Sequence, residues 1–302
     1  MSSSSTQNLA RARPAHSRER GGGPRVAALV AVLGASAGLF AGAGCKAKDD
    51  ARARPAVELR VFAASSLTEA FEDLAEGFEA ANPEVDVQLS FAGSQALRLQ
   101  IEQGATAEVF ASANATHMQA LVDAGLVEGA ATFASNELVV IVPIEAAPGT
   151  QAITTFDALD DAERVVIGAP EVPVGAYTRT LLDRAEAALG EDFVAKIRSH
   201  VVSEESNVRL VRAKVELGEA DAAVVYRTDA AASDTVRTIA IPGELGVRAG
   251  YEIGVVAGSP QATQARAFVA YVRSTRGRAL LEARGFTIEE DAGVGGEREA
   301  RP

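Results

Sequence analysis

The chain has 302 residues, of which 47% are hydrophobic and 5% aromatic, and its formal net charge at pH 7 is -12. This hydrophobic content excludes a disordered chain and predicts a core built mostly of Ala, Val and Leu. The acidity argues against nucleic acid as a partner, because nucleic-acid-binding proteins present basic surfaces. An anionic ligand would have to be held by local donors, against the overall field of the protein.

The first 44 residues predict an export signal. Arginines are scattered through residues 2–25, an uncharged apolar run occupies residues 26–44, and the single cysteine, Cys45, follows at once. This order of regions is typical of a secretory signal. It resembles a bacterial lipoprotein signal, in which the cysteine becomes the lipidated first residue. An uncleaved membrane anchor and an ordinary cleaved signal are the alternatives, and all three place the folded part outside the cytoplasm.

The next part of the chain alternates between strand and helix patterns. Residues 45–56 are charged and are expected to form a tether. Strand patterns occupy residues 57–63, 85–91 and 108–112, and a helical pattern follows each of them. This β-α-β-α-β-α rhythm predicts a parallel sheet with crossover helices.

The second half continues in the same way. Strands are expected at residues 137–143, 163–170, 221–226 and 251–259, and helices at residues 176–189, 207–217 and 260–281. Residues 288–302 are acidic and rich in glycine, which predicts a disordered tail.

Patterns of catalytic and metal-binding residues are missing from the sequence. There is no G-x-S-x-G, Walker or dinucleotide-binding glycine pattern. His16 lies in the signal region, while His117 and His200 lack metal-ligand spacing and are expected to be surface histidines. We therefore expect no enzyme, no site for a metal cation and no cofactor.

Several predicted helices begin directly after a strand or loop. These helix starts lie at residues 65–67, 93–95, 173–175, 206–208 and 226–228. Free amide hydrogens and the positive end of the helix dipole are exposed at such points. In open α/β sheets, ligands bind outside the carboxyl ends of the strands. Several starts around one crevice would form an anion site that needs no charged side chain.

The same residues also have purely structural interpretations. Residues 66–69 fit a capping box, in which Ser66 caps a helix, and Ser94 fits a cap equally well. Tyr226 ends a buried strand and fits a core residue. Arg209 and Arg212, the obvious cationic partners of an anion, are expected on a solvated face. Because a serine can cap a helix and bind a ligand together, the residues alone leave both interpretations open.

Six segments, in the same order along the chain, carry a family resemblance. They are FAASSLTEAFEDLAEGFE, FAGSQALRLQIEQGATAEVFASAN, NELVVIVP, GAPEVPVGAYTRTLL, SNVRLVRAKVELGEADAAVVYRTDA and FVAYVRSTRGRALLEARGF. From about residue 57 to 287 the chain resembles the periplasmic molybdate-binding proteins of ABC importers. The resemblance implies an α/β, two-lobed periplasmic-binding-protein fold of type II. It also implies an extracytoplasmic solute-binding protein that captures molybdate, and tungstate as well, for an inner-membrane permease and its ATPase.

The resemblance further implies which residues bind the tetrahedral oxyanion. Hydroxyls would come from Ser66, Ser94 and Tyr226, and main-chain amides from Val174 and Val208. The molybdenum would be bound as an oxyanion by these residues, not as a cation by metal ligands.

The resemblance also divides the chain into lobes. Lobe 1 would be residues 57–139 plus 254–287, and lobe 2 residues 140–253. The two serines belong to lobe 1 and the other three ligand-binding residues to lobe 2, so a bound ligand would favour the closed form. Three alternatives remain: a site for sulfate or an organic acid, a serine hydrolase for which no base is identified, and a surface lipoprotein used for protein contacts.

Overall fold

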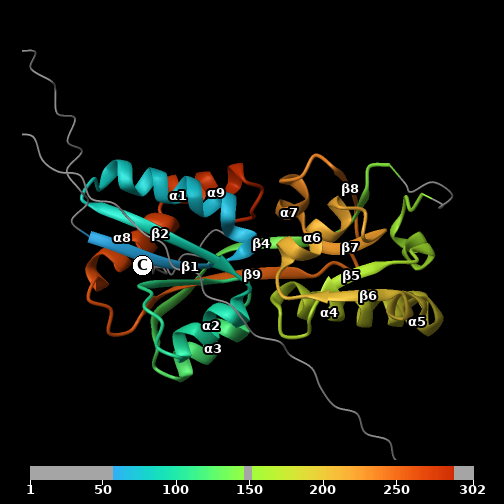
Figure 1. Cartoon of the computed structure of the whole chain (residues 1–302), viewed down its shortest axis with the longest axis horizontal. Coiled ribbons are helices and arrows are strands. Elements are labelled where there is room, and N and C mark those ends of the chain that lie inside the picture. The colour runs from blue at the N-terminus through green and yellow to red at the C-terminus, as the bar shows by residue number, and fades with distance from the viewer. Residues whose placement is uncertain (1–56, 146–151, 289–302) are drawn as a thin grey trace, which may run out of the picture. The chain divides into compact units, whose positions relative to one another are not determined.

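The computed structural model describes residues 57–145 and 152–288. The predicted signal, Cys45, the tether and residues 289–302 of the predicted tail lie outside the described residues. Figure 1 shows a sheet with helices on both of its faces, as the alternating strand and helix patterns predict. The α/β class is confirmed.

A nine-stranded sheet organises the described residues. Its strands are β1 (Val57–Ala64), β2 (Val85–Ala92), β3 (Val109–Ser112), β4 (Val127–Pro143), β5 (Val165–Gly168), β6 (Val201–Glu205), β7 (Ala222–Tyr226), β8 (Val236–Ile239) and β9 (Arg248–Val256). The spatial order is β2-β1-β3-β9-β4-β7-β5-β6, with β8 paired to β4 outside this path. Crossover pairs β1–β2, β1–β3, β5–β6 and β5–β7 are parallel, as expected for strands joined through helices.

Strand β4 divides the sheet into two parts, which we call sheet A and sheet B. Residues 127–137 of β4 pair with β9 in sheet A, beside β3, β1 and β2. Residues 138–143 of β4 pair with β7 and β8 in sheet B, beside β5 and β6. The changeover lies next to the predicted lobe boundary at residues 139 and 140, and the extents of the lobes stay a prediction.

Sheet A is covered on both faces because its strands alternate between two cores. Leu59 and Val61 of β1 face the larger core, and Phe62 between them faces the smaller one. The helices around sheet A are α1 (Thr68–Ala81), α8 (Ala262–Arg273) and α9 (Thr275–Ala283) on the first face, with α2 (Ser94–Glu102) and α3 (Ala115–Asp123) on the second (Figure 1).

Sheet B is likewise enclosed by helices. They are α4 (Pro173–Leu189) with α5 (Glu191–Ser199) on one face, and α6 (Val208–Glu216) with α7 (Arg227–Ala231) on the other (Figure 1). Strand β7 is buried along its whole length, as a near-continuous apolar run predicts for a central strand.

Some predicted elements differ from the structure. The single helix predicted at residues 260–281 is wrong: Ser274 is extended, with φ -69° and ψ 165°, and its side chain caps a new helix by accepting a hydrogen bond from Gly277 N at 3.2 Å. Helices α5 and α7 and strands β6 and β8 were not predicted, because they are short or half-exposed. Strand β4 begins ten residues before the apolar run that predicted it, since its first part is half-exposed and bulged.

Candidate functional site

One cavity lies where the carboxyl ends of strands from both sheets meet. The residues that line it are Ala64, Ser65, Ser66, Ala92, Gly93, Ser94, Ala113, Val172, Pro173, Val174, Asn207, Val208 and Tyr226. These residues end or follow β1, β2, β3, β5, β6 and β7. The space at this place that no protein atom fills, including the part open to solvent, is about 190 Å³. All five residues predicted to bind the ligand are among them, so the structure brings the predicted set together.

Ser66 does not cap helix α1, and the capping-box prediction is wrong. A 3-10 turn, η1 (Ser65–Leu67), precedes the helix, so that Leu67 takes the N-cap position without a side-chain hydrogen bond. The Ser66 side chain is buried, and its Oγ accepts a hydrogen bond from the Tyr251 hydroxyl at 3.0 Å. The hydroxyl is therefore positioned by a distant strand.

Ser94 does not cap its helix either. Gly93 occupies the N-cap position of α2, and the Oγ of the fully buried Ser94 accepts a hydrogen bond from Ala113 N at 3.0 Å. A hydroxyl has one hydrogen and two lone pairs. Each of the two serines accepts a protein hydrogen bond and keeps its hydrogen for another partner at the cavity.

Two helices beside sheet B begin at the cavity. Helix α4 starts with Pro173, whose missing N–H is not needed in a first turn, and the amide of Val174 follows. Helix α6 starts with Val208 after Asn207, whose side chain accepts a hydrogen bond from Leu210 N at 3.1 Å. The other first-turn amides have no carbonyl partner within their helix. Both starts thus bring N–H groups and a positive dipole end to the cavity.

Gly175 allows α4 to begin close to β5. A Cβ atom at this position would overlap the backbone carbonyl oxygens of Gly168 and Ala169. The glycine two residues after Pro173 is therefore a packing requirement, because a side chain there would push the start of α4 away from the strand.

Tyr226 brings a buried hydroxyl to the cavity. Its side chain is 1% exposed, and its hydroxyl has no hydrogen-bond partner among the described residues. Burial raises the pKa of Tyr226 well above its usual range, so that the phenol stays protonated at neutral pH. A buried hydroxyl without a partner is costly. The arrangement points to a partner from outside the chain.

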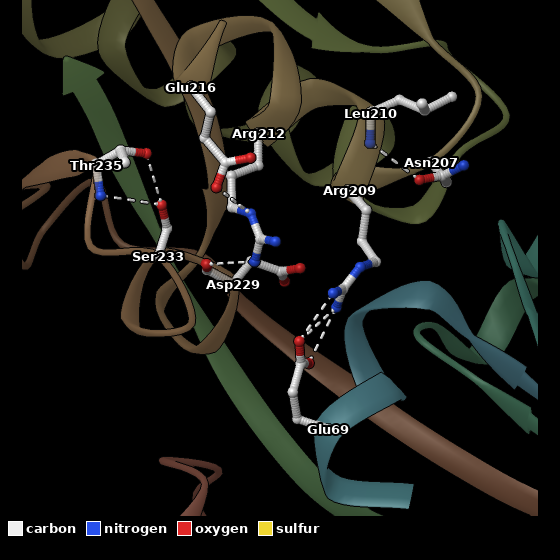
Figure 2. A network of polar contacts seen from close by, with 9 residues as sticks. All are labelled: Glu69, Asn207, Arg209, Leu210, Arg212, Glu216, Asp229, Ser233 and Thr235. Carbon is white, nitrogen blue, oxygen red and sulfur yellow. Dashed lines mark hydrogen bonds and ion pairs between the residues drawn. The ribbon is translucent and has the colours of Figure 1, made fainter. Parts of the chain in front are cut away.

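The expectation that Arg209 and Arg212 lie on a solvated face is wrong, because both are at least half-buried and form ion pairs. Arg209 of α6 reaches across to Glu69 of α1 and donates to both carboxylate oxygens at 2.8 and 3.0 Å (Figure 2). Partial burial would raise the pKa of Glu69, but Arg209, a backbone hydrogen bond and the charge of Arg212 together outweigh burial, and the pKa is lowered. Arg212 is buried; it donates to Asp229 O at 2.9 Å and pairs with Glu216 at 3.0 Å (Figure 2).

Two more hydrogen bonds join the same parts of the chain around the cavity. Gln95 of α2 donates to Ser206 O at 2.7 Å. His117 of α3 donates from Nε2 to Glu171 O at 2.8 Å. His117 is 6% exposed, so the prediction of a surface position is wrong, and burial lowers its pKa. His200, by contrast, is half-buried.

A buried polar cluster that was not predicted lies behind the cavity. Asn136 Nδ2 donates to Thr228 Oγ1 at 2.8 Å, and both residues are buried. Tyr251 is fully buried, and Asp229 is 3% exposed. Burial raises the pKa of Asp229 to about 7, although Arg212 and Arg209 oppose that rise. The sequence offered one signal for this cluster, namely Tyr251 as the first residue of the strand predicted at residues 251–259.

Two further features concern the described residues only. Over residues 57–145 and 152–288, no three His, Cys, Asp or Glu side chains gather in a way that could hold a metal ion. None of the helices in these ranges has the length and apolar character needed to cross a membrane.

Comparisons with known proteins place the chain in a family. Residues 59–287 match the family of bacterial extracellular solute-binding proteins. The molybdate-binding protein ModA of Mycobacterium tuberculosis is 42% identical over 229 residues, which is 75% of this chain and 83% of that protein. The molybdate-binding protein ModA of Escherichia coli is 34% identical over 239 residues, 77% of this chain and 90% of that protein.

A solved structure gives the same result for the fold. The periplasmic molybdate-binding protein of Azotobacter vinelandii superposes with a TM-score of 0.66 at 20% identity, covering 77% of this chain and 100% of that chain. This likeness confirms the two-lobed periplasmic-binding-protein fold. Together with the match over residues 59–287, it shows that the chain belongs to the bacterial extracellular solute-binding protein family.

Proposed function

We propose that this protein captures molybdate in the cavity at the carboxyl ends of the strands and delivers it to an ABC transporter. The observation that carries the proposal is the Tyr226 hydroxyl, which is buried at the cavity with no partner in the described residues. An oxyanion would accept its hydrogen bond. The same oxyanion would accept from Ser66, Ser94 and the main-chain amides of Val174 and Val208, which line the same cavity.

The character of the cavity supports a small anion. None of its thirteen lining residues is charged. Helix N-termini bind phosphate-like and sulfate-like groups through their amides and dipole. The cavity therefore favours an oxyanion held by neutral donors within an acidic protein.

The origin of the donors supports capture by closure. Ser66 and Ser94 follow strands of sheet A, whereas Val174, Val208 and Tyr226 belong to sheet B or the helices beside it. A ligand that needs all five donors stabilises the arrangement in which they meet. This closed form would be recognised by an inner-membrane permease and its ATPase.

The identity of the anion rests on the relatives. Proteins 42% and 34% identical to this chain are named for molybdate, and we expect tungstate to bind as well because it is a tetrahedral dianion of nearly the same size. Sulfate and small organic acids are the competing ligands. A fit set by cavity size and donor placement should keep molybdate bound in low millimolar sulfate.

The hydrogen-bond partners of Ser66 and Ser94 favour ligand binding over nucleophilic catalysis. A nucleophilic serine needs a base within hydrogen-bond reach. The partner of Ser66 is the Tyr251 phenol and the partner of Ser94 is a backbone amide, and neither is a base. We therefore propose a transport protein with no enzymatic activity, cofactor or cation site.

We also propose that the protein acts outside the cytoplasm as a lipoprotein. The apolar run at residues 26–44 and the single Cys45 support lipidation at that cysteine. Residues 45–56 would then tether the binding domain to the membrane. In this arrangement the protein captures its ligand near the transporter.

Titration calorimetry on serine variants tests the proposal. Wild-type protein should bind molybdate and tungstate tightly, and sulfate and phosphate weakly or not at all. Ser66→Ala and Ser94→Ala should each lower molybdate affinity by about tenfold or more, since each removes a hydrogen bond to a charged ligand. Each variant also leaves a buried protein donor without its acceptor, the Tyr251 hydroxyl or the Ala113 amide, so the apo melting temperatures should fall as well. The loss of affinity is therefore measured at a temperature at which both apo variants are folded.

Ser65→Ala is the matched control. Ser65 also lines the cavity but precedes the predicted ligand position, so this variant should bind almost as wild type does. If Ser66→Ala and Ser94→Ala bound molybdate as tightly as wild type, the proposed site would be wrong. If sulfate bound more tightly than molybdate, the site would stand and the proposed ligand would change.

A further inference from the structure

We propose that Tyr251 is a positioning residue that directs the hydroxyl hydrogen of Ser66 into the cavity, and that Asn136 in turn holds the Tyr251 hydroxyl. The inference rests on the proposed function, because it concerns how one of the proposed ligand donors is set. It adds two residues that do not line the cavity.

The contact between Tyr251 and Ser66 has a direction. The Tyr251 hydroxyl donates to Ser66 Oγ at 3.0 Å, inside the core and across 185 positions of the chain. A phenol has a single hydrogen to give, and Tyr251 gives it to Ser66. One lone pair of Ser66 Oγ is therefore occupied on the core side. The serine hydrogen is left for a partner other than Tyr251, and Ser66 lines the cavity.

The phenol keeps this direction at any physiological pH. Tyr251 is 0% exposed. Burial and, after it, the carboxyl of Asp229 raise the pKa of Tyr251 well above its usual range, and the side chains of Ser66 and Asn136 oppose the rise only in part. A neutral phenol remains a donor, whereas a phenolate would accept the Ser66 hydrogen and take it from the ligand.

Asn136 fixes the phenol from the other side. The orientation of its amide follows from its two neighbours: Oδ1 accepts from Glu137 N at 2.9 Å, and Nδ2 donates to Thr228 Oγ1 at 2.8 Å. Asn136 lies two residues after Ala134, the β4 partner of Tyr251, and so on the same face of the sheet. Its Nδ2 group carries a second hydrogen, which is the one available to the Tyr251 hydroxyl. A donated hydrogen at the phenol oxygen leaves Tyr251 free to donate to Ser66.

Asn136, Tyr251 and Ser66 form a series of side chains that we call the relay, and its first two members lie where the two sheets join. Asn136 lies in β4 next to the changeover between sheets A and B, and Tyr251 lies beside it in β9, paired with Ala134. The relay from Asn136 through Tyr251 to Ser66 thus begins where the two sheets join. We therefore infer that the direction of the Ser66 hydroxyl hydrogen is set by residues near the changeover between sheets A and B, and not by helix α1, which Ser66 precedes.

A double-mutant cycle tests this inference. Tyr251→Phe keeps the ring contacts and removes only the hydroxyl, so molybdate affinity should fall about three- to tenfold, the value of one neutral hydrogen bond. In a Ser66→Ala background the same change should alter affinity less than twofold, because the group that Tyr251 positions is absent. A merely structural role would lower affinity by the same factor in both backgrounds.

Two further variants complete the design. Tyr271→Phe removes a buried, unpartnered hydroxyl of α8, away from the cavity, and should leave affinity unchanged. Asn136→Ala removes the side chain at the other end of the relay. It should weaken molybdate binding in the wild-type background and leave it unchanged in the Ser66→Ala background. This second cycle decides the question if Tyr251→Phe does not fold.

The outcomes separate the two proposals. Equal losses with and without Ser66, or no loss in either cycle, would overturn the relay and leave the binding function intact. A wild-type protein that binds no oxyanion would overturn both.

Discussion

The Tyr226 hydroxyl is buried at the cavity without a partner in the described part of the chain. Tyr226→Phe should weaken molybdate binding about ten- to a hundredfold, because a hydrogen bond to a charged group contributes about 1.5 to 3 kcal/mol. The free energy of unfolding of the apo protein should be unchanged or slightly higher, since the variant removes an unsatisfied polar group. Calorimetry and apo melting curves measure both effects. Equal affinity in the variant and wild type would remove Tyr226 from the site.

Asp229 should make stability depend on pH in an unusual direction. Its pKa is raised to about 7, mainly by burial, whereas an unfolded aspartate has a pKa of about 4. Between these values the folded protein binds more protons, so this group lowers the free energy of unfolding as pH rises from about 4 to 7, with little further change above that. The charged groups around it, Arg212, Arg209 and Glu69, influence this pKa in both directions.

Asp229→Asn tests that assignment, since asparagine imitates the neutral form. The variant should gain more than about 1 kcal/mol in unfolding free energy at pH 8 and much less at pH 5. Urea denaturation at both pH values measures the difference. The same change in stability at pH 5 and pH 8 would show that Asp229 does not titrate in this range.

At the scale of elements, helices α1 and α6 are joined by one ion pair. Arg209 of α6 and Glu69 of α1 are each 31% exposed and come from the parts of the chain beside sheets B and A, respectively. If this pair forms only in the closed form, Glu69→Gln should lower molybdate affinity by up to about fivefold, since a partly exposed pair contributes about 1 kcal/mol or less.

A matched control lies on the same helix. Asp73 of α1 pairs with Arg284 directly after α9, and both partners belong to the same side of the molecule. Asp73→Asn should lower the melting temperature slightly and leave molybdate affinity unchanged. If Glu69→Gln and Asp73→Asn affected binding equally, the α1–α6 pair would have no role in closure.

The elements that sequence predicts well are those with a local cause. The strands β1 and β2 follow from alternating apolar residues. The start of α4 follows from Pro173 at its first position, and the start of α6 follows from Asn207 as a side-chain cap. Strand ends and helix starts gather at one edge of an α/β sheet, which predicts an anion site there. The five proposed ligand residues themselves were named through the family resemblance, because the local patterns fit caps and core residues equally well.

What sequence could not predict depends on distant partners. Ser66 and Ser94 each fit a local cap, yet one accepts from Tyr251 and the other from Ala113. Arg209 looks like a solvated residue until Glu69, 140 positions earlier, is brought beside it. No local pattern carries these pairings, because they arise only when β9, β3 and α1 pack around the cavity.

At the scale of the whole molecule, the proposed lipid anchor is open to a direct test. Cys45 is the single cysteine and follows an uncharged apolar run. Cys45→Ser should move the protein from the membrane fraction to the soluble fraction. Mass spectrometry of the wild-type protein should find Cys45 as a lipid-modified first residue. A free thiol on a longer N-terminus would contradict lipidation.

The central claim is that molybdate binds between the strand ends of the two sheets. A crystal structure of the protein grown with molybdate, with diffraction data collected at the molybdenum absorption edge, locates the metal atom directly. The account predicts one anomalous peak in the cavity, with oxygens within hydrogen-bond distance of Ser66, Ser94, Val174, Val208 and Tyr226. A peak elsewhere, or an empty cavity in crystals grown with saturating molybdate, would contradict it.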